Sequence, residues 1–238
     1  MKINTINKLD IKVEKLALDG FKILHLSDLH IDTKTDIFYI DKLIDLCQKT
    51  KYDVLFITGD IIDCKVSKIK DKLLLLNTLR NAYFISGNHD LFYGLDELKN
   101  ILSQITFLDN KIEFIDFKDK EIAIGGLSDR FSKFFRIKRD EEKLLNTLNK
   151  YENSILLAHQ PKDYEYATKN YIDVFLCGHT HGGQIYPFHY IVKLFQPFLY
   201  GLHYIDKTAI YVNKGIGTWG VDFRYKADSE ISLINLIY

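Results

Sequence analysis

The sequence predicts an α/β fold, and three observations lead to that class. Short apolar runs, each the length of a buried strand, recur along the chain. Segments with helical spacing lie between several of these runs, for example Ile37, Ile40, Ile44 and Cys47. Polar residues follow directly where many of the runs end. This combination indicates strands that alternate with helices and carry a site at their carboxyl ends.

Six apolar runs are the strands expected as far as residue 178. They are FKILHLS near residue 21, YDVLFIT near 52, AYFIS near 82, EIAIGGL near 121, SILLAH near 154 and IDVFLCG near 172. Leu144, Leu145 and Leu148 predict a helix between the fourth and fifth runs. Two later runs, TAIYVN and ISLINLI, are expected to complete a second sheet. No repeat or Pro/Gly/Ser-rich linker interrupts the pattern, so we expect residues 1–238 to form a single domain.

The composition limits the partners and the compartment that we expect. Lys plus Arg and Asp plus Glu each total 32, so no whole-chain field attracts nucleic acid or anionic lipid. The three cysteines form no CxxC pair, which favours reduced thiols over a disulfide framework. The first twenty residues mix charges throughout and lack the apolar run of a signal peptide or membrane anchor. We therefore expect a cytoplasmic protein that is neither exported nor membrane-spanning.

Five of the expected strands end in polar clusters. Any one of them is weak, because Gly and Asp after a strand usually form an ordinary turn. Together they carry more information, since five of the eight histidines lie in these clusters, among glycines and carboxylates. The carboxyl ends of strands in open α/β sheets meet in one crevice, so we expect these clusters to converge. They occupy residues 27–30, 58–60, 86–90, 158–159 and 177–181.

The order of these clusters resembles the calcineurin-like metallophosphoesterase superfamily. The series is DxH (Asp28, His30), GD (Asp60), GNHD (87–90), a single His after a strand (His159) and GHTH (178–181). The resemblance runs from residue 21 to about residue 185. It implies a four-layer α-β-β-α sandwich of two mixed sheets, with a metal site at the carboxyl ends of the strands. It also implies an enzyme, a hydrolase acting on phosphoric ester or pyrophosphate bonds.

The resemblance further implies a ligand set for two divalent ions. Asp60 would bridge them, and His89, with Asp90 beside it, resembles the histidine that contacts the phosphate and serves as general acid. The first ion would be held by Asp28, His30, Asp60 and His181, and the second by Asp60, Asn88, His159 and His179.

Elementary chemistry agrees with such a centre. Imidazole and carboxylate ligands without thiolate suit Mn, Fe or Zn and disfavour Ca, with Mn the expected metal, and Cys177 is not needed as a ligand. Two cations about 3.5 to 4 Å apart that share a carboxylate can activate a bridging water and neutralise charge on phosphate oxygens. An imidazole with a pKa of about 6.5 can protonate the leaving oxygen, which suits His89.

Other polar residues are weaker candidates. Asp63 can orient a ligand histidine or a water, although a solvated loop carboxylate is an equal alternative. Asp129 can face the site from its strand end, but we favour a structural role. His25 lies inside a strand and is expected to be a packed, hydrogen-bonded core residue. His189 and His203 lie in an aromatic stretch and are expected not to be ligands.

Two segments bear on the substrate. Residues 130–139 interleave five basic groups with three phenylalanines and an isoleucine, which suits an anionic partner with an apolar portion. The alternative, which we favour, is a helix with one face packed and the other solvated. Residues 185–200 are rich in Tyr and Phe and contain Pro187 and Pro197, so they are too short and broken to span a bilayer. They can form an apolar rim beside the metals, and the two segments together can contact the inner membrane face peripherally.

The tail YVNKGIGTWGVDFRYKADSEISLINLI, together with HTHGGQIYP, is similar to a bacterial subgroup whose members often sit at membranes. That subgroup includes enzymes of the UDP-diacylglucosamine pyrophosphatase type, which belong to lipid A biosynthesis. The leading hypothesis is therefore hydrolysis of a phosphate ester or pyrophosphate, with a lipid-linked nucleotide such as UDP-2,3-diacylglucosamine as substrate. A cytosolic phosphodiesterase or nuclease is the alternative, which the neutral charge disfavours. A non-catalytic scaffold is disfavoured because every motif ligand and His89 are present.

Overall fold

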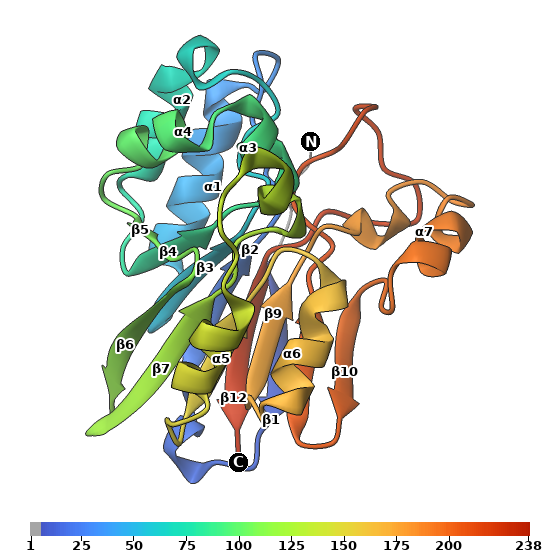
Figure 1. The fold of residues 1–238 in the computed structure, drawn as a ribbon. Helices are drawn as coiled ribbons and strands as arrows, with labels where there is room; N and C mark the ends of the chain where they lie inside the picture. The colour runs from blue at the N-terminus through green and yellow to red at the C-terminus, as the bar shows by residue number, and fades with distance from the viewer. Residues whose placement is uncertain (1–5) are drawn as a thin grey trace.

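The computed structural model describes residues 6–238 and arranges them in four layers (Figure 1). Two six-stranded sheets lie in the middle, with the strand orders β1-β12-β2-β3-β4-β5 and β10-β11-β9-β8-β7-β6. Both are mixed, because each combines parallel and antiparallel pairs. Helices cover the outer face of each sheet, so the expected α-β-β-α sandwich is confirmed.

The first sheet is parallel from β2 to β5, and β12 enters it between β1 and β2. Its strands are β1 (Asn7–Lys12), β2 (Lys22–Leu26), β3 (Val54–Thr58), β4 (Ala82–Ile85), β5 (Thr106–Phe107) and β12 (Ser232–Ile237). Its outer face carries α1 (Ile37–Lys49), α2 (Lys70–Leu76) and α4 (Leu95–Ile101).

The second sheet is parallel in its middle and antiparallel at both edges. Its strands are β6 (Lys111–Phe117), β7 (Lys120–Gly126), β8 (Ser154–Leu157), β9 (Val174–Cys177), β10 (Gly201–Ile205) and β11 (Thr208–Val212). Its outer face carries α5 (Glu141–Leu148) and α6 (Tyr164–Lys169).

One expected strand lies in the other sheet. The run ISLINLI was expected to complete the second sheet, but as β12 it pairs with β1 and β2 in the first. The nineteen-residue connection after β11, residues 213–231, is long enough to carry the chain from one sheet to the other. The expectation for TAIYVN is confirmed, because β11 pairs with β9 in the second sheet.

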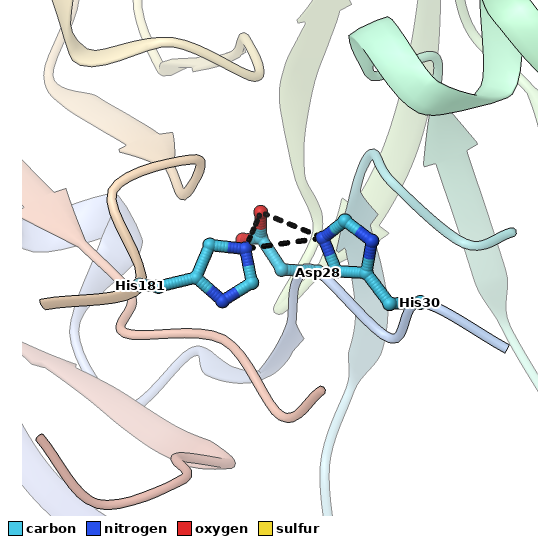
Figure 2. Close-up of side chains that lie close together, drawn as sticks. All are labelled: Asp28, His30 and His181. Atoms are coloured by element: carbon cyan, nitrogen blue, oxygen red, sulfur yellow. Dashed lines mark hydrogen bonds and ion pairs between the residues drawn. The ribbon is translucent and has the colours of Figure 1, made fainter. Parts of the chain in front are cut away.

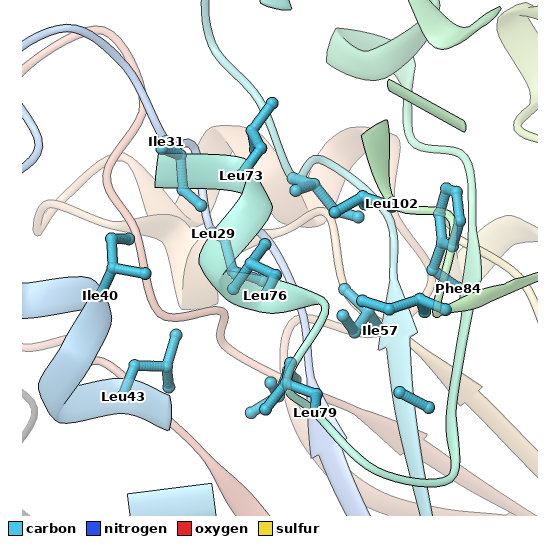
Figure 3. Packing of buried hydrophobic residues seen from close by; sticks show 14 of the residues in the cluster. Leu29, Ile31, Ile40, Leu43, Ile57, Leu73, Leu76, Leu79, Phe84 and Leu102 are labelled. Atoms are coloured by element: carbon cyan, nitrogen blue, oxygen red, sulfur yellow. The ribbon is translucent and has the colours of Figure 1, made fainter. Parts of the chain in front are cut away.

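Strand alternation divides the apolar residues between the layers. In β3, Leu55 and Ile57 face the helices of the first sheet, whereas Val54 and Phe56 face the second sheet. Figure 3 shows Ile57 on the helical side, near Leu76 of α2. Each such side chain contributes roughly 1.5 to 3 kcal/mol when it is fully buried. Each such strand packs on helices with one face and on the other sheet with the opposite face, and this packing fixes the position of its ends.

Short helices occupy the connections around these layers. α7 differs from the longer helices because it buries none of its residues. Within residues 6–238, no helix combines the length and the apolar character that crossing a bilayer requires. The elements are η1 (Leu16–Leu18), η2 (Val66–Lys68), α3 (Asn88–Tyr93), η3 (Arg130–Phe135), η4 (Pro161–Asp163), η5 (His181–Gly183) and α7 (His189–Phe195).

Candidate metal centre

The loops after four strands bring six of the seven expected ligands together. One group joins residues that follow β2 and β9, and a second joins residues that follow β3, β8 and β9. Within each group the ligand atoms lie within 4.8 Å of one another. The groups are Asp28, His30 and His181, and Asp60, His159 and His179.

The first group presents two imidazoles and one carboxylate to a common point (Figure 2). Nε2 of His30 lies 3.1 Å from Nε2 of His181, which lies 3.4 Å from Oδ1 of Asp28. All three side chains are buried. Nitrogen and carboxylate donors without a thiolate suit a borderline divalent ion such as Mn, Fe or Zn.

Asp60 belongs to the second group and also lies close to the first. Its Oδ2 is 3.2 Å from Nε2 of His159 and 3.7 Å from Nε2 of His30, which belongs to the first group. Nδ1 of His179 lies 3.1 Å from the same His159 nitrogen. One carboxylate thus faces donors of both groups, as a bridging ligand must.

Asn88, the seventh expected ligand, has an unsatisfied acceptor. It is the first residue of α3, and its Oδ1 is buried without a hydrogen-bond partner. Its neighbour His89 donates its backbone N–H to Oδ1 of Asp60, at 2.8 Å. A buried acceptor without a partner costs about 1 to 3 kcal/mol. Asn88 and Asp60 line the same cavity, so this oxygen fits a cation held beside Asp60.

The backbone at these residues is strained. Five of them have positive φ: Asp28 (51°), His30 (46°), Asp60 (51°), His179 (72°) and His181 (51°). For residues other than glycine, this region costs roughly 1 to 3 kcal/mol each and tends to occur at functional sites. The strand-end turns thus aim side chains inward at the expense of local stability.

Two glycines allow the loops to approach closely. A Cβ on Gly87 would collide with the carboxylate of Asp60, and a Cβ on Gly178 would collide with Ser27 and Asp28. The motifs GNHD and GHTH therefore need glycine at their first position because the neighbouring loops leave no room for a Cβ.

In the second group, the charges of Asp60 and His159 shift each other's pKa values. Burial raises the pKa of the Asp60 carboxyl, but the imidazoles of His159 and His30 outweigh burial and lower that pKa below its usual range. Burial lowers the pKa of His159, but the charge of Asp60 raises it well above 6.5. A divalent cation would neutralise the charge of Asp60 in place of a proton on His159, so metal binding would be coupled to release of that proton. Burial and His159 lower the pKa of His179 to about 3, which leaves its ring neutral.

His89 borders the cavity, and Asp63 holds its ring. Nδ1 of His89 lies 2.7 Å from Oδ1 of Asp63, whose Oδ2 is 3.9 Å from Nδ1 of His30. Burial lowers the pKa of His89, but the bond to Asp63 and the charge of Asp60 outweigh it and raise the pKa above 6.5. Asp63 thus orients His89, whereas Nδ1 of His30 has no hydrogen-bond partner among the described residues. A role for Asp63 toward a ligand histidine stays a prediction.

Asp90 points away from the cavity. Its carboxylate accepts the backbone N–H groups of Ile61, Ile62 and Gly87, at 2.8, 3.1 and 2.9 Å. Burial and the charge of Asp60 raise the pKa of Asp90 to about 7. This residue ties the loop after β3 to the loop after β4, so it can act only through their geometry.

The remaining candidates lie outside both groups. His25 is buried, with Nε2 2.9 Å from Oγ1 of Thr58, and burial lowers its pKa to about 3. Asp129 accepts from Nε2 of Gln160 at 2.9 Å and caps η3 through the N–H of Phe131, which supports the structural role. His189 and His203 line a different cavity.

Residues 130–139 do not form the helix with one packed face that we favoured. They begin with the short η3, and its phenylalanines are exposed, Phe134 by 80%. The outer face of the second sheet is already covered by α5 and α6, so η3 packs on α3 instead. The ring of Phe135 lies 5.1 Å from that of Phe92.

Arg224 is a residue that the sequence reasoning missed. It lies in the connection after β11, and this half-buried residue extends its guanidinium among backbone carbonyls. It donates to the carbonyls of Gly217 (2.8 Å), His181 (3.2 Å) and Lys214 (2.9 Å). A lone arginine after GIGTWG in the quoted tail was the available signal.

Arg224 also contacts the ring of His181. Its Nη2 lies 3.0 Å from Nδ1 of that ring. A guanidinium can only donate, so a neutral His181 carries its proton on Nε2, the nitrogen that faces His30. If Nε2 binds a metal, the ring proton would lie on Nδ1, and Arg224 would then hold His181 through its backbone carbonyl instead of through the ring.

The metal groups form the floor of a cavity of about 540 Å³. Its walls are mostly apolar and come from α7 and from residues 219–221. α7 contributes Phe188, at its start, with Ile191, Val192 and Phe195. The expectation of an apolar rim from residues 185–200 agrees with this wall, whereas the part played by Trp219 and Val221 was missed.

Comparisons with known proteins agree with this arrangement. The family model described as Calcineurin-like phosphoesterase matches residues 21–183. An uncharacterized metallophosphoesterase of Helicobacter pylori is 33% identical over 240 residues, which cover 98% of this chain and 64% of that protein. A Danio rerio protein named "Transmembrane protein with metallophosphoesterase domain" is 31% identical, over 95% of this chain and 56% of that protein.

Solved structures share the fold. The NAD nucleotidase of Haemophilus influenzae has a TM-score of 0.58 at 20% identity, over 82% of this chain and 45% of that one. A likeness at this identity concerns the fold alone. The chain spans 64% of the Helicobacter protein and smaller shares of the other two.

Proposed function

The chain belongs to the calcineurin-like phosphoesterase family, and from that premise we propose which residues carry the chemistry of this metal-dependent phosphoesterase. Asp60 would bridge two divalent ions, with Mn the expected metal. The observation that carries the proposal is the convergence of neutral nitrogen and anionic oxygen donors from separate loops, with the unpartnered oxygen of Asn88 beside them. The first ion would be held by Asp28, His30, Asp60 and His181, and the second by Asp60, Asn88, His159 and His179.

The metal ions, when bound, supply an activated water and neutralise charge on the phosphate. His89 donates a proton to the leaving oxygen, since its ring borders the cavity and Asp63 fixes its Nδ1. The raised pKa of His89 keeps the donating form present at neutral pH. Asp90 positions His89 and Asp60 relative to each other through the backbone groups that it accepts.

Metal analysis and an aryl-phosphate assay test this assignment. We expect about two equivalents of metal per chain. We expect His89→Ala to keep that metal and to lose roughly 10² to 10⁴ in kcat, as removal of a general acid does. His203→Ala, outside the metal groups, is the matched control. Equal rates for wild type and His89→Ala would remove His89 from the mechanism.

The cavity supports a substrate that joins a phosphate to an apolar group. Its floor is polar and charged, whereas the wall from α7 and residues 219–221 is mostly apolar. A lipid-linked nucleotide such as UDP-2,3-diacylglucosamine, from lipid A biosynthesis, combines these features. We therefore extend the proposal to an enzyme of the membrane-associated subgroup in which this chain forms one domain. It would act from the cytoplasm and contact the inner membrane face peripherally through residues 130–139 and 185–200.

A substrate panel at fixed Mn concentration tests this extension. The panel contains UDP-2,3-diacylglucosamine, nucleotide diesters and aryl phosphates. We expect the highest kcat/KM for the lipid, because its acyl chains are buried against the apolar wall and soluble esters lack this binding energy. A preference for soluble nucleotides would reject the lipid substrate and support the phosphodiesterase alternative.

A further inference from the structure

More than half of the exposed large apolar side chains gather around the mouth of the catalytic cavity, and the others, such as Phe38 and Tyr171, lie singly elsewhere. Three clusters carry those at the mouth: residues 92–93 with 131–135, residues 186–195, and residues 219–225. The second and third form the cavity wall. The first adjoins His89, whose ring lies 5.9 Å from that of Tyr93. An exposed apolar surface of this kind, placed at a site, indicates a partner.

α7 presents three different faces. Phe188, before its first residue, Ile191, Val192 and Phe195 face the catalytic cavity. His189 and Lys193 face a second cavity of about 630 Å³. Tyr190 and Leu194 line neither cavity and are 60% and 80% exposed. A helix at a water-facing surface normally turns polar residues outward, so the outward face of α7 is unusual for an aqueous surface.

The second cavity is basic and aromatic. Lys193 and Lys226 line it together with Tyr186 and Tyr225. Nζ of Lys226 lies 4.7 Å from the ring centroid of Tyr186. Among residues 6–238, neither lysine has a carboxylate partner within 4.0 Å.

An unpartnered acceptor lies where the two cavities adjoin. Gln196, which follows α7, lines both cavities, and its buried Oε1 has no hydrogen-bond partner. The second cavity thus offers positive charge and a free amide group. Its chemistry suits a phosphate that carries a hydroxyl-bearing group.

We infer that α7 and residues 219–226, which we term the α7 face, dock on a membrane that contains anionic phospholipid. Tyr190 and Leu194 enter the lipid interface, and the second cavity receives a phosphate headgroup between Lys193 and Lys226. The mixture of Tyr, Trp and Lys around an apolar helix is the composition of an interfacial surface. The inference rests on the proposed function, which already places residues 185–200 at the inner membrane face, and adds the anionic headgroup, the cavity that receives it and the side chains that enter the lipid.

This docking gives the apolar wall a purpose in substrate entry. The catalytic cavity opens beside the face that contacts lipid, so an acyl chain can move from the bilayer to Ile191 and Phe195 without full exposure to water. A protein partner would also cover the apolar residues, but it would not account for the basic cavity with its free amide.

Vesicle sedimentation tests the inference. The probes are phosphatidylcholine vesicles with and without phosphatidylglycerol, and the protein is the full chain, with Mn and after treatment with a chelator. We expect phosphatidylglycerol to tighten binding about tenfold or more. We expect Leu194→Gln, and separately the pair Lys193→Gln and Lys226→Gln, to weaken it about tenfold. Binding should persist without metal, whereas the proposed hydrolysis requires it.

Matched controls separate docking from general surface effects. Leu16 is 70% exposed in η1, away from the cavity mouth, so Leu16→Gln should bind vesicles like wild type. Lys51→Gln with Lys150→Gln removes the same charge from other exposed positions and should also leave binding unchanged. Leu194→Gln should keep the wild-type rate on aryl phosphates.

Three outcomes would overturn the inference. Equal vesicle binding by wild type and Leu194→Gln would remove the helix from the interface. Binding of soluble glycerol phosphate by the lysines, with no binding to vesicles, would make the second cavity a site for a free metabolite. A dimer that Leu194→Gln abolishes, again without vesicle binding, would assign the α7 face to a second copy of the chain.

Discussion

The floor and the wall of the catalytic cavity are built in opposite ways. The floor consists of buried polar residues that directly follow strands, with positive φ and short hydrogen bonds. The wall consists of exposed apolar residues on α7, which buries none of its residues, and on an irregular loop. Reactive groups need fixed geometry, which the sheets supply, whereas substrate selection can be left to parts of low local stability. The two regions should therefore respond differently to substitution.

Loss of the shared carboxylate should have the largest effect. Asp60→Asn keeps the size of the side chain and an acceptor for the N–H of His89, but it removes the charge that faces both metal groups. We expect kcat on aryl phosphates to fall at least about a thousandfold, with loss of bound metal. Metal analysis and steady-state kinetics measure this, with Asp41→Asn on the exposed side of α1 as control. A loss smaller than tenfold would show that Asp60 is not the bridge.

Arg224 contacts both His181 in the floor and the loop that leads to the wall, and its removal should weaken metal binding. Arg224→Gln loses the contacts to His181 and to the carbonyls that shape the loop before Trp219. Groups that hold a metal ligand in place typically contribute 10- to 100-fold to metal affinity, so we expect a drop of about that size. Titration with Mn measures it, and exposed Arg80→Gln is the control. A lower melting temperature with unchanged Mn affinity would limit Arg224 to a structural role.

A substitution in the wall should affect one substrate class only. Ile191→Ser removes apolar surface from the cavity without touching the metal groups. We expect kcat/KM for an acylated substrate to fall about tenfold, which is the scale for a lost apolar contact in a pocket, and the rate on aryl phosphates to stay unchanged. Ile37→Ser, at a similarly exposed isoleucine of α1, is the matched control. Equal losses on both substrates would mean that α7 supports the floor as well.

The smallest expected effect concerns a buried acid beneath the floor. Burial raises the pKa of Asp109 from 3.8 to about 6, although bonds from Ser86 oppose the change. Its folded pKa is raised, so its stabilising contribution is complete below pH 3.8 and is lost as the pH rises through about 6. The melting temperature of wild type relative to Asp109→Asn should therefore fall between pH 4 and 7, by a few degrees. A pH-independent difference between the melting temperatures of wild type and Asp109→Asn would contradict the prediction.

The residues of the floor could be predicted from the sequence better than those of the wall. Strand runs are local patterns, and the polar residues at their ends meet because parallel strands end at one edge, so the expected positions of Asp28, Asp60 and His159 required no knowledge of packing. Arg224 and Trp219 lie in an irregular connection, and they reach the site through contacts with distant residues that no periodicity reveals. The sheet of β12 was assigned wrongly for the same reason, because a strand run does not specify its partner.

The position of β12 between β1 and β2 has a consequence for how the chain is assembled. Asn235 donates to Asp10, 225 positions earlier in the chain. β1 pairs only with β12, which is synthesised much later, so β1 remains unpaired until β12 has been made. Its alternating charged residues, Lys8, Asp10 and Lys12, disfavour pairing with other chains during that wait. Although β1 comes first among the described strands, its hydrogen bonds to the sheet form only after β12 has been made.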